Sequence, residues 1–314
     1  MPRNRSALKI TEAELKLIAL LSTSSATDGL YLEMQPIMSL DAPFKSLNFE
    51  VLLRMRDGKG QLIPTSRLIS AAEFSGRMGV IDRWVLSQTL SWIEANQGRL
   101  TQTVFVCINL SGASLNDERF VQEVFQMLQR HAAIVNSLCL EITESALFKD
   151  YQRALDNLRR LKALGVRIAM DDFGTGFSSL STLQSFPFDK IKIDKSFVEN
   201  IHRHDRATVI VRAVLGLGRS LEIPCVAEGV ETQEQIDFLR GENCAELQGY
   251  AIGRPAPVDT LSAWTLASEA AASVPLLSAL LSPDRWLLWL GVLFVLSVYY
   301  FPTGVVGRLR ARRA

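Results

Sequence analysis

Residues 138–172, LCLEITESALFKDYQRALDNLRRLKALGVRIAMDD, carry the clearest signal of the fold class in this 314-residue chain. Two short β-rich runs, Leu138–Ile142 and Arg167–Asp171, flank a helical pattern over Tyr151–Ala163, whose apolar residues recur at three- and four-residue spacing. Gly165 follows that pattern and is the residue type that commonly ends a helix. The stretch therefore predicts two parallel strands joined by a crossover helix.

The same alternation continues along the chain as far as residue 260. The predicted strands are Tyr31–Met38, Leu47–Met55, Thr103–Asn109, Leu138–Ile142, Arg167–Asp171, Lys190–Ile193, Ile223–Ala227 and Glu246–Tyr250. The predicted helices are Ser66–Glu73, Arg83–Glu94, Asp117–Arg130, Tyr151–Ala163, Ala207–Leu221 and Thr232–Arg240. Eight strands with intervening helices favour an α/β fold of the TIM-like (β/α)8 barrel type, which typically takes about 250 residues.

The composition disfavours nucleic-acid binding and predicts no disulfide bonds. Lys and Arg number 34 against 33 Asp and Glu, so the net charge of +1 gives no global basic field and we expect no nucleic-acid partner. The four cysteines are widely spaced without a CxxC pair, which predicts buried free thiols in a reducing compartment.

Four segments are predicted along the chain: an N-terminal lead-in helix (1–28), the barrel (29–262), a linker (263–285) and a hydrophobic tail with a basic end (286–314). Residues 286–307 contain no charge, a run long enough to cross a hydrocarbon core of about 30 Å as a helix. Aromatic residues lie at both ends of the run and four arginines follow it. We therefore expect a C-terminal hydrophobic helix that associates with a membrane.

Polar residues fall at or near the carboxyl ends of the predicted strands, where a parallel barrel brings all strands to one mouth. These residues are Glu50, Asn109, Glu141, Asp171, Asp172, Lys192, Glu228 and Gln248. Carboxylates gathered at one point repel one another, so the pattern predicts bound cations between them. Oxygen ligands without thiol or imidazole favour Mg²⁺ or Mn²⁺, and two such ions are the usual means of phosphodiester hydrolysis.

Ordered motifs make the chain resemble the EAL family of cyclic di-GMP phosphodiesterases over residues 29–262. They are Gln35–Pro36, Glu50–Val51–Leu52 with Arg54, INLS at Ile108–Ser111, ExTE at Glu141–Glu144, DDFGTG at Asp171–Gly176, KID at Lys192–Asp194, AEGVE at Ala227–Glu231 and QGY at Gln248–Tyr250. The resemblance implies hydrolysis of cyclic di-GMP to linear pGpG by a cytoplasmic barrel that forms a homodimer.

The resemblance also implies a role for each matching residue. Glu50, Asn109, Glu141 and Asp171 correspond to ligands of one metal, and Asp171, Asp172 and Glu228 to ligands of the second. Lys192, Glu228 and Glu231 correspond to the catalytic residues around the attacking water. The substrate-binding positions are Gln35, Arg54 and Gln248. Glu144 corresponds to the anchor of the loop 172–179.

Val51 stands where the family usually has alanine, but alternation along the strand turns its side chain away from the metals, so we expect catalysis to survive. The alternative function is a non-catalytic cyclic di-GMP receptor. Such degenerate members usually lack a ligand, and none is missing here. The motif set therefore favours catalysis.

The tail poses a question of topology, because a cytoplasmic barrel and cytoplasmic terminal arginines do not agree with a single crossing of the inner membrane. Three alternatives stay open: a second crossing over residues 261–281, a tail lying in the membrane interface, or a tail packed on another protein. Residues 289–310 also resemble the last helix of branched-chain amino acid and urea ABC permeases, which would make the tail a fused remnant.

Overall fold

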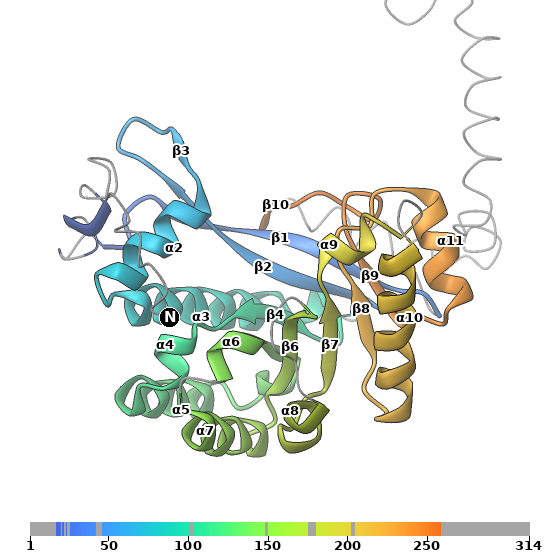
Figure 1. Ribbon diagram of the computed structural model, residues 1–314. Helices are drawn as coiled ribbons and strands as arrows, with labels where there is room; N and C mark the ends of the chain where they lie inside the picture. The colour runs from blue at the N-terminus through green and yellow to red at the C-terminus, as the bar shows by residue number, and fades with distance from the viewer. Residues whose placement is uncertain are drawn as a thin grey trace, which may run out of the picture.

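The computed structural model describes residues 17–19, 21, 23, 26–41, 46–100, 103–147, 150–174, 180–201 and 205–258 (Figure 1). The predicted linker and hydrophobic tail, and most of the lead-in helix, lie outside these residues. No helix within the described ranges is both long and apolar enough to span a membrane.

Eight strands close into a barrel, as predicted. They are β1 (Leu30–Ser39), β2 (Leu47–Arg56), β4 (Val106–Asn109), β5 (Leu138–Thr143), β6 (Arg167–Phe173), β7 (Lys190–Ile193), β8 (Cys225–Ala227) and β9 (Glu246–Gln248). Strand β2 pairs in parallel with β4, and each strand from β4 to β8 pairs in parallel with the next. Strand β1 closes the ring by pairing with both β9 and β2. Two short edge strands, β3 (Leu62–Ile63) and β10 (Ala256–Pro257), extend the ribbon of β2 and β1.

One strand departs from the predicted all-parallel barrel, because β1 runs antiparallel to both of its neighbours. Only residues 40–46 separate β1 from β2. A connection of that length joins antiparallel strands, whereas a parallel pair needs a crossover of a dozen or more residues. The register places Gln35 opposite Glu50, so the first strand still contributes to the mouth of the barrel.

Helices cover the outside of the barrel (Figure 1). They are α2 (Thr65–Phe74), α3 (Met78–Asn96), α4 (Gly112–Leu115), α5 (Glu118–Arg130), α6 (Glu144–Leu147), α7 (Tyr151–Ala163), α8 (Leu180–Ser185), α9 (Lys195–Val198), α10 (Asp205–Ser220) and α11 (Gln233–Gly241). The ends follow the sequence signals: Gly165 adopts a positive φ of 101° after α7, and Thr232 caps α11 with Gln235 in a capping box. The prediction missed the short helices and β3 and β10.

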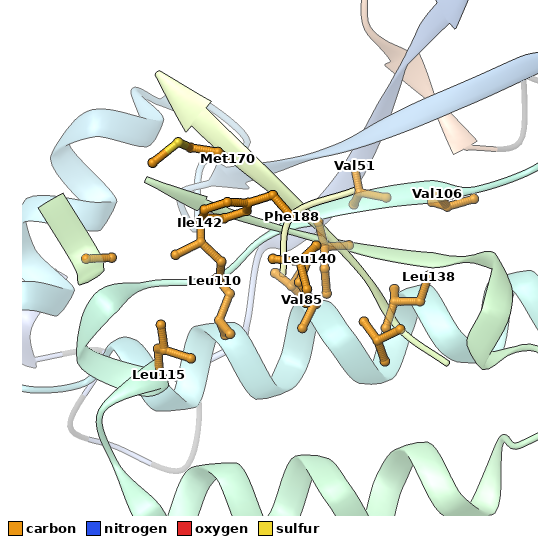
Figure 2. Close-up of a cluster of buried hydrophobic side chains, with 14 of the residues drawn as sticks. Val51, Val85, Val106, Leu110, Leu115, Leu138, Leu140, Ile142, Met170 and Phe188 are labelled. Atoms are coloured by element: carbon orange, nitrogen blue, oxygen red, sulfur yellow. The ribbon is translucent and has the colours of Figure 1, made fainter. Parts of the chain in front are cut away.

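The core has two parts, one on each face of the sheet. Outside the barrel, Val51, Val106 and Leu140 pack with Val85 of α3 (Figure 2). Val51 belongs to this outer layer and not to the inner cluster, so its side chain lies on the face of β2 opposite Glu50. Inside, the barrel is filled by a separate buried cluster of Ile37, Phe105, Cys107, Cys139, Ala169 and Val226. Four free cysteines are buried, as the composition predicted.

A buried polar layer lies inside the barrel at the amino ends of its parallel strands. Lys190 of β7 forms an ion pair with Glu246 of β9, and Asn48 Nδ2 of β2 donates a hydrogen bond to Glu246 Oε1 at 3.0 Å. The Lys190 ammonium also lies 4.2 Å from the centroid of the Phe105 ring. The Lys190–Glu246 ion pair lies one layer below the mouth of the barrel, because Lys192 and Gln248 at the mouth are two residues further along the chain.

Candidate active site

Strand alternation explains why so many polar side chains meet at one mouth. Successive residues of a strand point to opposite faces, so residues two apart lie on the same face. The inward-facing residues one layer below the mouth are Asn48, Cys107, Cys139, Ala169, Lys190, Val226 and Glu246. Two residues further on stand Glu50, Asn109, Glu141, Asp171, Lys192, Glu228 and Gln248. The barrel itself therefore gathers seven of the predicted site residues.

At the centre of this group lies Lys192, whose side chain is buried within a ring of carboxylates. Its Nζ lies 2.6 Å from Glu228 Oε1, 2.9 Å from Glu141 Oε1 and 3.1 Å from Glu50 Oε2. Asp171 Oδ1 is slightly further away, at 3.6 Å. One ammonium thus faces four carboxylates, three from β2, β5 and β6 and one from the residue directly after β8.

The amide side chains of Asn109, Gln248 and Gln35 form a hydrogen-bond network with carboxylates of the ring. Asn109 Nδ2 donates to Glu50 Oε1 at 2.9 Å and to Glu141 Oε2 at 3.4 Å. Gln248 Nε2 donates to the other Glu50 oxygen at 2.6 Å and to Gln35 Oε1 at 3.2 Å. These bonds fix the orientation of the Glu50 carboxylate from both sides.

A β-bulge allows two consecutive aspartates to face the same site. Between Met170 and Phe173, β6 advances one residue more than β7, and Asp172 adopts a positive φ of 54°. In a regular strand Asp171 and Asp172 would point to opposite faces. Here the ligand oxygens of Asp171, Asp172 and Glu228 all lie within 4.8 Å of one another. A left-handed backbone is strained for a residue other than glycine, and at Asp172 this strain lies within the candidate site.

Burial and mutual repulsion shift the titration of the site. Burial, and next the charge of Asp171, raises the pKa of Asp172 to about 6. Burial likewise raises the pKa of Glu228 to about 7, although the nearby Lys192 opposes the shift. Burial alone would lower the pKa of Lys192, but the surrounding carboxylates outweigh it and hold the pKa well above its usual range. The ammonium is therefore charged at neutral pH, and the ring is short of positive charge.

Two cavities open beside the ring. The smaller one, of about 290 Å³, is lined by Gln35, Glu50, Asp171, Lys195, Glu228, Gly229, Glu231, Gln248, Gly249 and Tyr250. The larger one, of about 660 Å³, contains Asn109, Arg54 and apolar residues of α2 and α3. Because Asn109 donates to Glu50, which lines the smaller cavity, the two cavities are adjacent. Most of the carboxylates that face a cavity line the smaller one, so the candidate active site lies there, although the other cavity is larger.

The remaining predicted residues lie around this centre. Glu231 lines the smaller cavity. Arg54 lines the larger cavity, where its Nε donates to Glu33 Oε2 at 2.8 Å. Glu144 begins α6 and is 3% exposed, but residues 175–179 of the loop that it is predicted to anchor lie outside the described residues.

Sequence reasoning missed a supporting carboxylate in α3. Asp82 is buried, and its Oδ2 accepts hydrogen bonds from Ser111 Oγ at 2.6 Å and from Ser111 N at 3.3 Å. Ser111 lies two residues after Asn109 and caps α4, so Asp82 holds the chain immediately beyond a predicted metal ligand. The available signal was a lone acid within the apolar stretch VIDRWVL.

The donor set fits divalent cations. Five carboxylates against one ammonium leave four uncompensated negative charges when all are ionised, which is the charge that two divalent cations carry. Asp171 Oδ1 and Gln248 Oε1 are buried and accept no hydrogen bond from any described residue. Hard oxygen donors of this kind suit Mg²⁺ or Mn²⁺.

Comparison with known proteins identifies the family. The model of the EAL domain matches residues 19–255, so the chain belongs to the EAL domain family. An "uncharacterized signaling protein" of Caulobacter vibrioides is 59% identical over 250 residues, which are 80% of this chain and 30% of that protein. The cyclic di-GMP phosphodiesterase NbdA of Pseudomonas aeruginosa is 34% identical over 275 residues, 88% of this chain and 35% of that protein.

Solved structures agree with this assignment. The chain is similar to the PaMucR phosphodiesterase in complex with c-di-GMP, with a TM-score of 0.72 and 34% identity over 78% of this chain and 99% of that one. It is also similar to the FimX EAL domain of Pseudomonas aeruginosa bound to c-di-GMP, with a TM-score of 0.68 and 25% identity over 78% and 95% of the two chains. The chain spans about a third of the length of the two curated relatives above.

Proposed function

We propose that this barrel hydrolyses cyclic di-GMP to linear pGpG by a two-metal mechanism. The observation that carries the proposal is the buried ring of four carboxylates within 3.6 Å of Lys192 Nζ at the barrel mouth. Burying four carboxylates together is unfavourable unless cations compensate their charge, which favours a site built to bind metal ions. Relatives named as cyclic di-GMP phosphodiesterases support the substrate.

The correspondence with the family's motifs assigns two metal positions, and the gathering of these side chains at one mouth supports them. Glu50, Asn109, Glu141 and Asp171 would hold one Mg²⁺ or Mn²⁺, and Asp171, Asp172 and Glu228 the second. When bound, such a pair of ions polarises the phosphate and makes water a better nucleophile near neutral pH.

The protein's own residues orient the attack. Lys192 lies at the centre of the ring, within 2.6–3.1 Å of Glu228, Glu141 and Glu50, and from there its ammonium donates a hydrogen bond to the attacking water and fixes its position. Glu228 accepts the proton of that water, and Glu231, which lines the same cavity, holds the water in place. The water oxygen bonds to phosphorus, the P–O3′ bond breaks, and a proton returns to the O3′ leaving group. The product then carries a 5′-phosphate at one end and a free 3′-hydroxyl at the other.

Substrate contacts come from residues around the ring. Arg54 exchanges its ion pair with Glu33 for a substrate phosphate, because a guanidinium suits phosphate geometry. Gln35 and Gln248 border the smaller cavity, where they face the bound dinucleotide.

Two further features of the proposal concern assembly and location. The barrel acts as a homodimer in the cytoplasm, with Glu144 anchoring the loop 172–179 that links dimerisation to metal binding. The hydrophobic tail at 286–314 attaches the barrel to the inner membrane. Both statements rest on the sequence.

The test is chromatography of the products that the full-length protein forms from cyclic di-GMP with Mg²⁺, with Mn²⁺ or with EDTA. Metal-dependent pGpG is expected from the wild type, and Glu50→Ala or Asp171→Ala should remove it while circular dichroism stays unchanged. Tight binding of cyclic di-GMP without pGpG would instead assign the alternative function of a receptor. Full activity in either variant would contradict the site assignment.

A further inference from the structure

The short helix α4, which begins three residues after Asn109, is held in place by a carboxylate of α3. Asp82 is 6% exposed, and its Oδ2 accepts hydrogen bonds from Ser111 Oγ at 2.6 Å and from Ser111 N at 3.3 Å. Ser111 Oγ in turn accepts a hydrogen bond from Ser114 N at 3.1 Å, so Ser111 caps α4. One carboxylate therefore fixes both the backbone and the side chain of the residue two positions after Asn109.

Helix α4 is also held from the side of α6. A Cβ added to Gly112 would lie 2.8 Å from both Cα and Cβ of Ala146, so the two helices are in close contact. Asn116 Nδ2 donates hydrogen bonds to Gly112 O at 2.8 Å and to Ala146 O at 3.3 Å. The first turn of α4 is thus confined between α3 and α6 and has little freedom to move.

Asn109 depends on these contacts because burial does not hold it. It is exposed at the end of β4, where its Nδ2 donates to Glu50 Oε1 and Glu141 Oε2. The backbone beyond it is anchored at Leu110, whose N donates to Glu141 O at 2.9 Å, and at Ser111 by the carboxylate of α3. An exposed side chain keeps one position only when its backbone is fixed, so these anchors matter more at Asn109 than at the buried Glu141.

We infer that Asp82 is a positioning residue, which acts through Ser111 to hold Asn109 where a divalent cation binds. This inference rests on the proposed function, because it takes Asn109 as a metal ligand. Side chains that orient a metal ligand without touching the metal typically contribute roughly 10- to 100-fold to metal affinity. The carboxylate of Asp82 and the hydroxyl of Ser111 act as a pair, because a hydrogen bond to an ionised acceptor is stronger than one to a neutral acceptor.

The test measures Mn²⁺ binding to the full-length protein from the electron paramagnetic resonance signal of free Mn²⁺. Asp82→Ala and Ser111→Ala should each raise the Kd for Mn²⁺ about 10-fold. Ser111→Thr keeps a hydroxyl, so its Kd should stay within about 3-fold of the wild type. Asp150→Ala is the matched control, because Asp150 caps α7 by accepting from Arg153 N at 3.2 Å and lines neither cavity beside the ring.

Two further measurements separate positioning from a purely structural role. Loss of a helix N-cap typically costs about 1 kcal/mol, so Asp150→Ala should lower Tm in EDTA much as Ser111→Ala does, yet keep the wild-type Kd for Mn²⁺. The double variant Asp82→Ala/Ser111→Ala should bind Mn²⁺ no more weakly than the weaker single variant, because both changes remove the same hydrogen bonds. Additive losses, about 100-fold in Kd, would contradict the claim that Asp82 acts through Ser111.

Wild-type Kd values in both Asp82→Ala and Ser111→Ala would overturn the inference, and so would an equal rise of Kd in Asp150→Ala. A Ser111→Thr variant that binds as weakly as Ser111→Ala would overturn it too. If circular dichroism shows that Asp82→Ala does not fold, the two Ser111 variants decide the outcome. A wild type that binds no Mn²⁺ would refute the two-metal function itself, whereas a wild type that binds Mn²⁺ no better than the variants refutes only the positioning role.

Discussion

Replacing Lys192 by methionine should destabilise the metal-free protein and make it more responsive to divalent cations. Lys192 Nζ contacts Glu228, Glu141 and Glu50 at 2.6–3.1 Å inside a buried site. Methionine has a similar length but no charge, so Lys192→Met leaves these carboxylates to repel one another without a counter-ion.

The size of the effect follows from the burial of the pair. Removing one partner of a buried ion pair typically costs about 3–5 kcal/mol. For a domain of this size each kcal/mol lowers Tm by about 2–4 °C, so the metal-free variant should melt about 6–20 °C below the wild type. Mg²⁺ at 100 times its Kd adds about 2.7 kcal/mol of stability. Because the ammonium no longer competes with the cation, the Mg²⁺-induced rise in Tm should be larger in Lys192→Met than in the wild type.

The assay is thermal denaturation followed by circular dichroism, in EDTA and across a Mg²⁺ series. Lys190→Met is the matched control, because Lys190 forms a buried ion pair with Glu246 away from the mouth. It should lower Tm in EDTA, yet its response to Mg²⁺ should equal that of the wild type. An unchanged Tm for Lys192→Met in EDTA, or the same Mg²⁺ response in both variants, would refute the electrostatic account.

Three further predictions address single features. Glu228→Gln should keep Tm and lower kcat about 100-fold or more, since it removes a proton acceptor; an unchanged rate would remove Glu228 from the mechanism. Asp172→Asn should keep stability, because asparagine tolerates a left-handed backbone, whereas Asp172→Val should cost roughly 1–2 kcal/mol in denaturant unfolding; equal stabilities would contradict the strained bulge. Deleting residues 283–314 should move the protein from the membrane to the soluble fraction, and unchanged sedimentation would discard the anchor.

Much of the site could be predicted because strand alternation is a local property of the sequence. The β–α–β unit around Tyr151–Ala163 has the helix bounds that its apolar spacing indicates. Glu141 and Asp171 each lie two residues before the end of the strands that flank that helix, so their meeting follows from parallel pairing. Val51 confirms the same rule from the opposite face of β2.

The remaining features depend on tertiary geometry that no local pattern encodes. The antiparallel direction of β1 follows from the short connection 40–46, which the all-parallel reading did not use. The bulge at Asp172 appears only in the register between β6 and β7. The hydrogen bond from Gln35 Nε2 to Gly253 O joins residues 218 positions apart, so no local pattern of the sequence predicts it.

The two-metal site is tested most simply by a crystal structure of the full-length protein soaked with Mn²⁺, with anomalous scattering used to locate the metal. We expect two Mn²⁺ peaks, one among Glu50, Asn109, Glu141 and Asp171, and the second among Asp171, Asp172 and Glu228. Two peaks about 3.5–4 Å apart would establish the carboxylate ring as a two-metal centre. A mouth without Mn²⁺, with Lys192 still paired to all four carboxylates, would contradict it.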